Sequence, residues 1–280
     1  MELQEQIRRA ARALREADAL LVTAGAGMGV DSGLPDFRGN EGFWKAYPPM
    51  ARLGISFVEM ANPRWFERDP ALAWGFYGHR LNLYRRTVPH AGFARLLAIG
   101  RAKKAGHFVF TSNVDGQFQA AGFDEDRIEE CHGSIHHLQC TRPCSADIWE
   151  ARGVVVDVDE ARFRAREPLP RCPRCGALAR PNVLMFNDWD WVDHRTRQQS
   201  VRLRRWLDGL ARGGASLAVV ELGAGRAVAT VRMTSEGIAG AGKAVLIRIN
   251  PRDYEVPEGH IAIPLGAEEG TRLVAEGMGR

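Results

Sequence analysis

Five short apolar segments recur along the chain, separated by stretches with the periodicity of helices. They are residues 19–22, 107–111, 217–222, 244–249 and 260–263. Apolar residues at helical spacing precede the first segment, and a closing helix is expected over 270–278. Short buried strands that alternate with helices are typical of a parallel sheet covered by helices on both faces. We therefore predict an α/β fold whose binding site lies at the carboxyl ends of the strands.

Length and composition narrow the class of protein. The 280 residues are 45% hydrophobic and 26% charged, which excludes disordered, collagen-like and low-complexity chains. No apolar run approaches the roughly 18 residues of a membrane helix, and residues 1–6 lack the order of a signal peptide. We therefore expect a cytoplasmic protein without a membrane partner. The net charge of +4 comes from interleaved charges, which does not favour a nucleic-acid partner.

A glycine-rich turn follows the first predicted strand. Residues 23–29 read Thr-Ala-Gly-Ala-Gly-Met-Gly, and closely spaced glycines let backbone amides approach a phosphate. Such turns also occur in proteins that bind no nucleotide. Residues 31–39 then place two acids, an aromatic ring and an arginine just beyond the turn. No acidic residue stands at the distance where a dehydrogenase binds ribose, which argues against ordinary hydride transfer.

Polar residues follow the second predicted strand. Asn113 and Asp115 leave it at its carboxyl end, so they should face the same cleft as the glycine turn. Taken alone, the two residues favour a simple turn held by Asx hydrogen bonds. His132 stands beside Gly133, and an imidazole that titrates near neutral pH suits a general base. A structural histidine is the alternative.

Two stretches do not fit the sheet. Residues 42–88 are rich in aromatic side chains at partly helical spacing, which predicts a helical insertion. Residues 136–180 contain four of the five cysteines, in two knuckles: Cys140, Cys144, Cys172 and Cys175. Disulfides are not expected in a chain without an export signal, whereas four thiolates suit tetrahedral zinc. Four sulfur ligands leave no open position, so we predict a structural zinc ion, with four free buried thiols as the alternative.

Together these segments resemble the sirtuin family. The glycine turn running into 32–38, the 113–115 turn, the His132-Gly133 pair, the cysteine knuckles and 180–183 occur in the order seen in sirtuins. The resemblance spans roughly residues 18–267. It implies a large Rossmann-like domain and a small domain with the binding site between them.

The resemblance also sets expected domain boundaries. The Rossmann-like domain would be discontinuous and contain residues 1–41, 89–135 and 181–280. The small domain would combine the helical insertion 42–88 with a zinc-binding module over 136–180.

An activity follows from the same resemblance. In sirtuins, the acyl oxygen of a modified lysine attacks the ribose carbon that carries nicotinamide, nicotinamide leaves, and the acyl group moves to ADP-ribose. The chain would therefore be an NAD-dependent protein-lysine deacylase that consumes NAD as a co-substrate. Its partner would be a protein or peptide with an acylated lysine. The sequence does not indicate the oligomeric state.

The resemblance assigns expected roles to residues. His132 matches the base, Asn113 and Asp115 the residues that hold nicotinamide and its ribose, and Phe37 the ring that shields the reactive carbon. The other expected cofactor contacts are Ala24, Gly25, Ala26, Asp36, Arg38, Ser112, Gly223, Ala224, Gly225 and Asn250. The expected substrate contacts are Tyr77, Arg80, Val183 and Phe186.

The chain departs from the family pattern at four places. Gly29 replaces a serine and Ser112 a glutamine, and both changes bear on NAD affinity. Asn-Asp at 187–188 replaces Gly-Glu, and Gly-Ala-Gly at 223–225 replaces Gly-Thr-Ser, next to the acyl-peptide groove. These two changes leave an NAD glycohydrolase or ADP-ribosyltransferase as the alternative activity, and a non-catalytic NAD-binding module as a third.

One pair of residues bears on the acyl group. Tyr77 and Arg80 resemble the pair found in sirtuins that prefer malonyl, succinyl or glutaryl lysine, because an arginine fork suits a carboxylate. In the alternative interpretation, Tyr77 belongs to the core and Arg80 is a surface or ion-paired residue.

Overall fold

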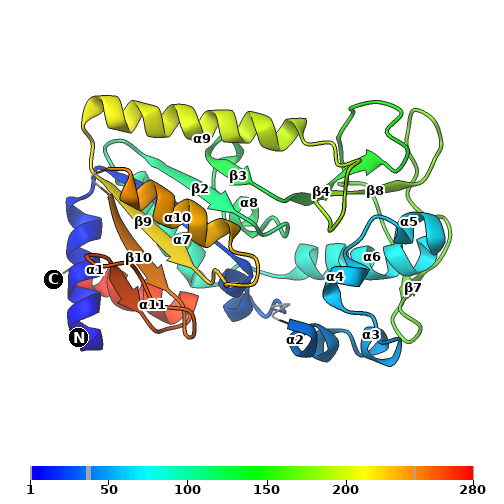
Figure 1. Ribbon diagram of the computed structural model, residues 1–280, viewed down its shortest axis with the longest axis horizontal. Helices are drawn as coiled ribbons and strands as arrows, with labels where there is room; N and C mark the ends of the chain where they lie inside the picture. Colours follow the sequence, from blue (N-terminus) through cyan, green and yellow to red (C-terminus); the bar gives the residue numbers. More distant parts are fainter. Residues whose placement is uncertain (1, 36–38, 243, 280) are drawn as a thin grey trace.

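The computed structural model describes residues 2–35, 39–242 and 244–279. Its larger part is a six-stranded sheet with the order β11-β10-β9-β1-β2-β3, and all neighbouring strands are parallel (Figure 1). The strands are β1 (Ala19–Ala24), β2 (His107–Thr111), β3 (Ile128–Glu130), β9 (Leu217–Leu222), β10 (Ala244–Ile249) and β11 (Ile261–Ile263). All five strands predicted from the sequence are present, and β3 was not predicted. The structure confirms the α/β fold class.

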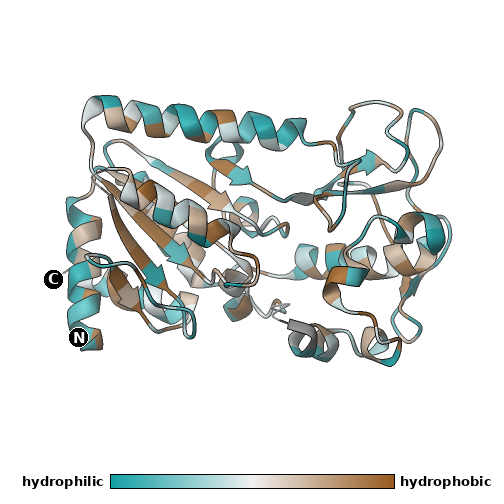
Figure 2. Cartoon of the chain, viewed as in Figure 1, coloured by the Kyte–Doolittle hydropathy of each residue, from teal (hydrophilic) through white to brown (hydrophobic). Residues whose placement is uncertain are grey.

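Helices cover both faces of this sheet. They are α1 (Leu3–Glu16), α7 (Ala91–Arg101), α9 (His194–Gly213), α10 (Thr230–Gly240) and α11 (Ala267–Met278). Leu20 and Val22 of β1 belong to a core cluster shared with α1, α7 and α11, whereas Ala19 and Leu21 pack in the cluster with α9 and α10. The alternation arises because successive side chains of a strand point to opposite faces. Figure 2 shows the hydrophobic strands in the interior and the largely hydrophilic α9 on the outside.

The smaller part, within the described residues, contains five helices and two small antiparallel sheets. The helices are α2 (Gly39–Ala46), α3 (Pro48–Arg52), α4 (Phe57–Met60), α5 (Trp65–Arg68) and α6 (Pro70–Arg86). The sheets are β5-β4-β8 and β6-β7, formed by β4 (Gly133–Cys140), β5 (Trp149–Glu150), β6 (Val158–Asp159), β7 (Arg164–Ala165) and β8 (Ala179–Val183). Short connecting elements are η1 (Ala26–Ser32), α8 (Gln117–Ala120) and η2 (Glu125–Arg127).

The aromatic helical insertion and the cysteine-rich stretch share one hydrophobic core. Phe43, Trp74 and Phe76 of the insertion pack in the same cluster as Leu138 and Phe163 of the cysteine-rich stretch. The Trp74 indole donates to the carbonyl oxygen of Ala179 at 2.9 Å. The two stretches therefore form a single body, although the exact domain boundaries stay a prediction.

β4 links this small body to the sheet. It starts directly after His132 and ends at Cys140, so one strand runs from the predicted base to the predicted zinc site. Asp36, Phe37 and Arg38, which were expected in the cofactor loop, lie outside the described residues. Within the described ranges, no helix is both long and apolar enough to cross a membrane.

Candidate active site

The glycine turn after β1 packs backbone to backbone against the loop after β9. The amide of Gly25 donates to the Leu222 carbonyl at 3.0 Å, and the amide of Gly27 donates to the Gly223 carbonyl at 3.0 Å. Gly223 has a φ of 61°, and a Cβ there would lie 2.3 Å from the backbone carbon of Gly27. Only glycine meets both conditions, because a side chain is strained at positive φ and has no room. The two loops thus form one smooth wall at the carboxyl ends of β1 and β9.

Asn113 ties the loop after β2 to this wall. Its side-chain amide donates to the Gly25 carbonyl at 3.0 Å, and its backbone amide donates to the Thr111 hydroxyl oxygen at 3.0 Å. The sequence left a simple Asx turn as the alternative at this loop. Asp115 does form such a turn, because its Oδ1 accepts from the Gln117 amide at 2.9 Å. The loop after β2 therefore contains an Asx turn and also places Asn113 against the glycine turn, so the two interpretations are compatible.

Burial raises the pKa of the Asp115 carboxyl group. Burial, with a smaller contribution from Glu130, raises this pKa to about 6 against the opposing effects of the Gln117 amide and Arg80. A carboxyl group with this pKa is mostly ionised at neutral pH. Asp115 can therefore accept hydrogen bonds from ribose hydroxyls or from a carboxamide.

His132 lies in the two-residue connection between β3 and β4. Gly133 follows with a φ of 75°, and a Cβ there would lie 2.1 Å from the Asn182 carbonyl oxygen, so only glycine fits after the histidine. The His132 carbonyl accepts from the Leu184 amide at 3.0 Å, which fixes the backbone. Burial lowers the pKa of the imidazole below its usual value, and a hydrogen bond to the Ser112 backbone opposes that shift. The ring is therefore neutral at pH 7, the state that a general base requires.

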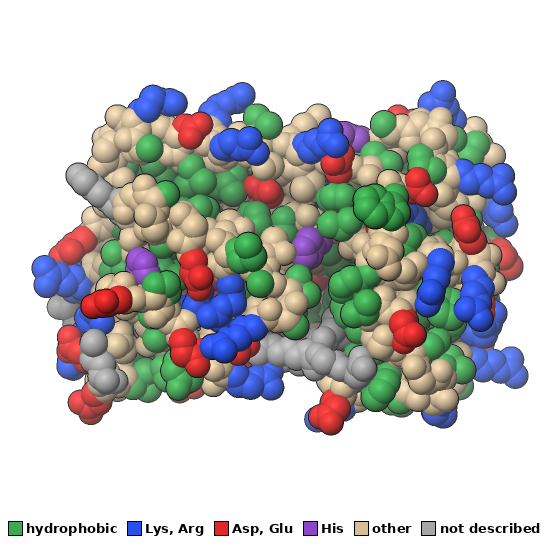
Figure 3. Space-filling model, in the orientation of Figure 1, with side chains coloured by type: hydrophobic (Ala, Val, Ile, Leu, Met, Phe, Trp, Pro, Cys, Tyr) green, Lys and Arg blue, Asp and Glu red, His purple; other side chains and the backbone are tan. Residues whose placement is uncertain are grey.

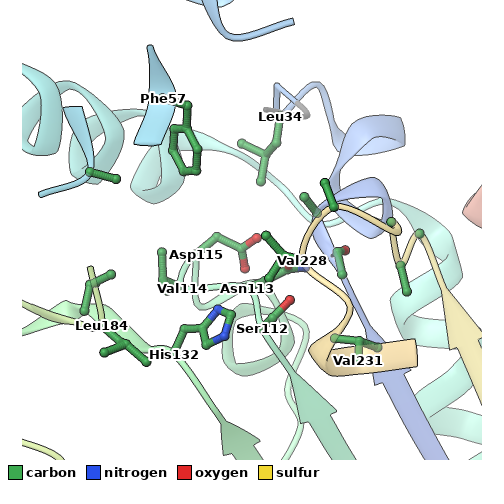
Figure 4. A pocket seen from close by; sticks show the side chains of 18 of the residues that line it. Leu34, Phe57, Ser112, Asn113, Val114, Asp115, His132, Leu184, Val228 and Val231 are labelled. Carbon is green, nitrogen blue, oxygen red and sulfur yellow. Dashed lines mark hydrogen bonds between the residues drawn. The ribbon is translucent and has the colours of Figure 1, made fainter. Parts of the chain in front are cut away.

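A cavity of about 500 Å³ brings most of the predicted site residues together. Those that line it are Gly25, Ala26, Tyr77, Arg80, Ser112, Asn113, Asp115, His132, Val183, Phe186, Gly223, Ala224 and Gly225. In Figure 4, Ser112, Asn113, Asp115 and His132 lie together on one side of the cavity, with Leu34 and Phe57 on the opposite side. On the face of the molecule in Figure 3, hydrophobic side chains gather in the middle, between the sheet and the small body.

Two predicted cofactor contacts do not line this cavity. Ala24 is fully buried in β1, and its carbonyl accepts from the Ser112 amide and the Thr111 hydroxyl. Asn250 is also fully buried, and its side-chain amide donates to the Ala224 carbonyl at 2.8 Å. Asn250 therefore holds the loop after β9 in place. A direct contact of either residue with the cofactor stays a prediction.

Part of the motif after the glycine turn holds the fold together. Asp31 accepts from the Glu268 amide at 2.8 Å, at the start of α11. Ser32 accepts from the His90 amide at 2.9 Å, just before α7. Side-chain oxygens in these positions stabilise helix starts, where backbone amides have no partner within the helix.

Sequence reasoning missed most of the apolar lining of the cavity. The additional residues are Leu34, Pro35, Phe57, Ala61, Tyr84, Val114, Leu184, Met185, Arg226, Ala227, Val228, Val231 and Asp253. Apolar residues in this set look like core residues in the sequence. Arg226 could have been predicted to line the cavity, because it directly follows the small residues 223–225, which were expected cofactor contacts.

The segment after β8 is held by a buried ion pair. Arg180 donates to both carboxylate oxygens of Asp188, at 2.7 and 2.8 Å, and both side chains are almost completely excluded from solvent. Asp188 also accepts from the Met185 amide at 3.3 Å. The substitution of Asn-Asp at 187–188 thus keeps a carboxylate that orders the segment. Val183, Met185 and Phe186 accordingly face the cavity.

Arg80 occupies a buried position in the cavity wall. Its Nε donates to the Tyr84 hydroxyl at 2.9 Å, and its guanidinium lies 5.3, 6.0 and 5.4 Å from the ring centres of Phe76, Tyr77 and Tyr84. Tyr77 is buried as well, and burial raises the pKa of its hydroxyl. Arg80 is therefore not a surface residue, whereas Tyr77 does belong to the core cluster of the small body, as the alternative interpretation stated.

The four cysteines of the two knuckles converge at the end of β4. Their sulfur atoms all lie within 4.8 Å of one another, with 3.7 Å between Cys140 and Cys175 and between Cys144 and Cys172. Zinc bound to four sulfurs at about 2.3 Å requires sulfur–sulfur distances of about 3.8 Å. The cluster therefore fits one tetrahedral zinc ion, at the opposite end of β4 from His132.

Comparison with known proteins identifies the family. The model of the Sir2 family matches residues 25–220. An NAD-dependent protein deacylase of Pyrococcus furiosus is 34% identical over 178 residues, which cover 62% of this chain and 63% of the relative. A deacylase of Thermus thermophilus is 30% identical over 280 residues, covering 96% of this chain and 94% of the relative. The chain belongs to the Sir2 family, which confirms the sirtuin resemblance of its motifs.

A solved structure supports the fold. The crystal structure of a Sir2 homologue in complex with NAD superposes with a TM-score of 0.71 at 24% identity, and the match covers 96% of this chain and 93% of that chain. In the sequence comparison, this chain spans about 63% of the length of the Pyrococcus furiosus relative.

Proposed function

We propose that this chain is an NAD-dependent protein-lysine deacylase that releases nicotinamide and transfers the acyl group to ADP-ribose. The observation that carries the proposal is the convergence of His132, Asn113 and Asp115 on one cavity beside the glycine wall. The deacylase names of the relatives from Pyrococcus furiosus and Thermus thermophilus support it.

The cavity fits NAD in its chemistry. Gly25, Ala26 and residues 223–225 offer small residues and backbone where a pyrophosphate would lie, and Asp115 offers a carboxylate for hydroxyls or a carboxamide. When bound, NAD would supply the labile bond between nicotinamide and ribose and the acceptor for the acyl group. The apolar lining would exclude water, which favours transfer over hydrolysis.

The chain's own residues would perform three tasks. His132, neutral at pH 7, would take a proton from a ribose hydroxyl. Asn113, held by the Gly25 carbonyl, and the ionised Asp115 would orient the nicotinamide half. The ordered segment that includes Val183 and Phe186 would line the path of the acyl-lysine.

The order of that segment favours deacylation over NAD hydrolysis. The Arg180–Asp188 pair keeps it in place despite the changed motif, which supports its use as the wall along which a peptide would bind. The test is nicotinamide release from NAD with and without acetyl-, succinyl- and long-chain acyl-lysine peptides. Release that requires a peptide supports the deacylase. Equal release without any peptide would instead favour the glycohydrolase or ADP-ribosyltransferase.

For the acyl group, we propose that Arg80 recognises an acidic acyl chain such as succinyl. A buried guanidinium that lines the cavity can donate a charge-assisted hydrogen bond to the carboxylate of such a substrate. The change Arg80→Met should lower kcat/KM for succinyl-lysine peptide by about 100-fold, and that for acetyl-lysine peptide by only a few fold. Nicotinamide release on both peptides measures the difference. Arg86→Met, an exposed arginine of the same helix, is the control. Equal losses on both peptides in Arg80→Met would refute the role.

A further inference from the structure

The turn that carries Asp115 is held from behind by an irregular part of β4. The pairing of β4 with β8 shifts between Ser134 and Leu138, which marks a bulge over the residues between them. Bulges re-aim side chains and often lie next to active sites. In this bulge, the Ile135 amide donates to the Val114 carbonyl at 3.0 Å. β4, which begins next to His132, is thus hydrogen-bonded to the turn after β2.

His136 makes the second contact between the bulge and the turn. Its Nε2 lies 2.8 Å from the main-chain carbonyl oxygen of Asp115. The same ring packs on Gly116, where a Cβ would lie 2.6 Å from the imidazole carbon Cδ2. Gly116 has a φ of 72°, so the turn needs glycine for its backbone as well as for this contact.

The direction of the hydrogen bond follows from the chemistry of the two groups. A carbonyl oxygen can only accept, so Nε2 of His136 must carry the proton. Burial lowers the pKa of His136, Arg85 and Arg195 lower it further, and the Asp115 carbonyl and Glu130 oppose the shift. The ring is therefore neutral at pH 7, with the proton on Nε2, and adds no charge behind Asp115.

We propose that His136 is a positioning residue that holds the Asp115 turn in the geometry that binds the nicotinamide half of NAD. It does not line the cavity and acts only through Asp115 and Gly116. The consequence for NAD binding rests on the proposed function, whereas the effect on the turn itself does not. Asp115 lies beside Asn113 in the cavity in Figure 4, so a small rotation of the turn would misplace its carboxylate.

Two substitutions separate the hydrogen bond from the packing. His136→Phe keeps a ring over Gly116 and removes the donor, whereas His136→Gln retains an N–H donor on a side chain of similar reach. His137→Phe alters the neighbouring histidine, which pairs with Glu150 of β5, and serves as the matched control.

The ligand-free protein provides the first readout. The Gln117 amide is bound to Asp115 Oδ1, so its hydrogen exchange reports on the order of the turn. We expect exchange at Gln117 to be about five- to tenfold faster in His136→Phe, nearly normal in His136→Gln, and unchanged in His137→Phe. Unchanged exchange in His136→Phe would overturn the proposal whether or not the protein binds NAD.

Binding and kinetics provide the second readout. Calorimetry should show an approximately tenfold weaker NAD affinity for His136→Phe, with KM for NAD raised, KM for the acyl peptide unchanged, and recovery in His136→Gln. Equal losses in the Phe and Gln variants, together with a lower melting temperature in both, would mean a structural role only. A wild-type protein that does not bind NAD would contradict the proposed function, and the exchange experiment would still decide the role of His136.

Discussion

His132→Ala is expected to reduce peptide-dependent nicotinamide release by roughly 10²- to 10⁴-fold, because positioned general bases contribute this much. The neutral imidazole lies in the cavity wall with Ser112, Asn113 and Asp115, and in the proposed mechanism it would take a proton from a ribose hydroxyl of NAD. The alanine variant removes the base and leaves the glycine wall intact. NAD affinity should therefore change by only a few fold. Nicotinamide quantification measures the first effect, and calorimetry measures the second.

His194→Ala is the matched control for this variant. His194 is exposed at the start of α9, away from the cavity lining, and its loss should leave release unchanged. A normal rate in His132→Ala would contradict the role of the histidine as base. A complete loss of NAD binding in that variant would instead assign His132 to cofactor binding.

Loss of zinc is expected to have the largest effect on stability. Purified protein should contain one zinc per chain, and Cys172→Ser should lose it. Structural zinc contributes about 10 kcal/mol or more of folding free energy in small zinc domains, because the binding site exists only in the folded chain. Phe163 and Leu169 lie between the knuckles and belong to the core of the small body, so disorder there should spread to α6. We expect a melting temperature lower by about 10 °C or more, measured by circular dichroism.

Cys131 provides the control for the zinc experiment. It lies outside the cluster, next to His132, and burial raises the pKa of its thiol to about 12, so it stays protonated. Cys131→Ser should retain a full equivalent of zinc and a nearly normal melting temperature. A wild-type protein that is folded and free of metal would refute the zinc site.

The sequence predicted the sheet well because its central strands are buried on both faces. Segments such as 217–222 are almost continuously apolar and end at the observed strand ends. β3 escaped prediction because it has only three residues and two of them, Glu129 and Glu130, are acidic. Both glutamates are buried, and Glu130 pairs with Arg195 of α9 at 2.6 Å, a contact that no local pattern reveals.

Some residues of the candidate site could likewise be predicted from the sequence, and others could not. Asn113, Asp115 and His132 could be found because each follows a strand and lies next to a glycine or an Asx turn. Leu34, Phe57 and Met185 could not, because an apolar residue that lines a cavity has the same local sequence as one in the core. Arg80 was predicted through the resemblance of the Tyr77–Arg80 pair, whereas its burial among aromatic rings is visible only in the structure. His136 required the structure, because only the β4 bulge turns its ring toward the Asp115 carbonyl.

Product analysis tests the central claim most directly. The protein would be incubated with NAD and an acyl-lysine peptide, and mass spectrometry would identify every product. The proposed deacylase should yield equal amounts of nicotinamide, deacylated peptide and acyl-ADP-ribose, with none of them formed when the peptide is unmodified. Free ADP-ribose and nicotinamide formed at the same rate with an unmodified peptide would contradict the claim and would establish an NAD glycohydrolase.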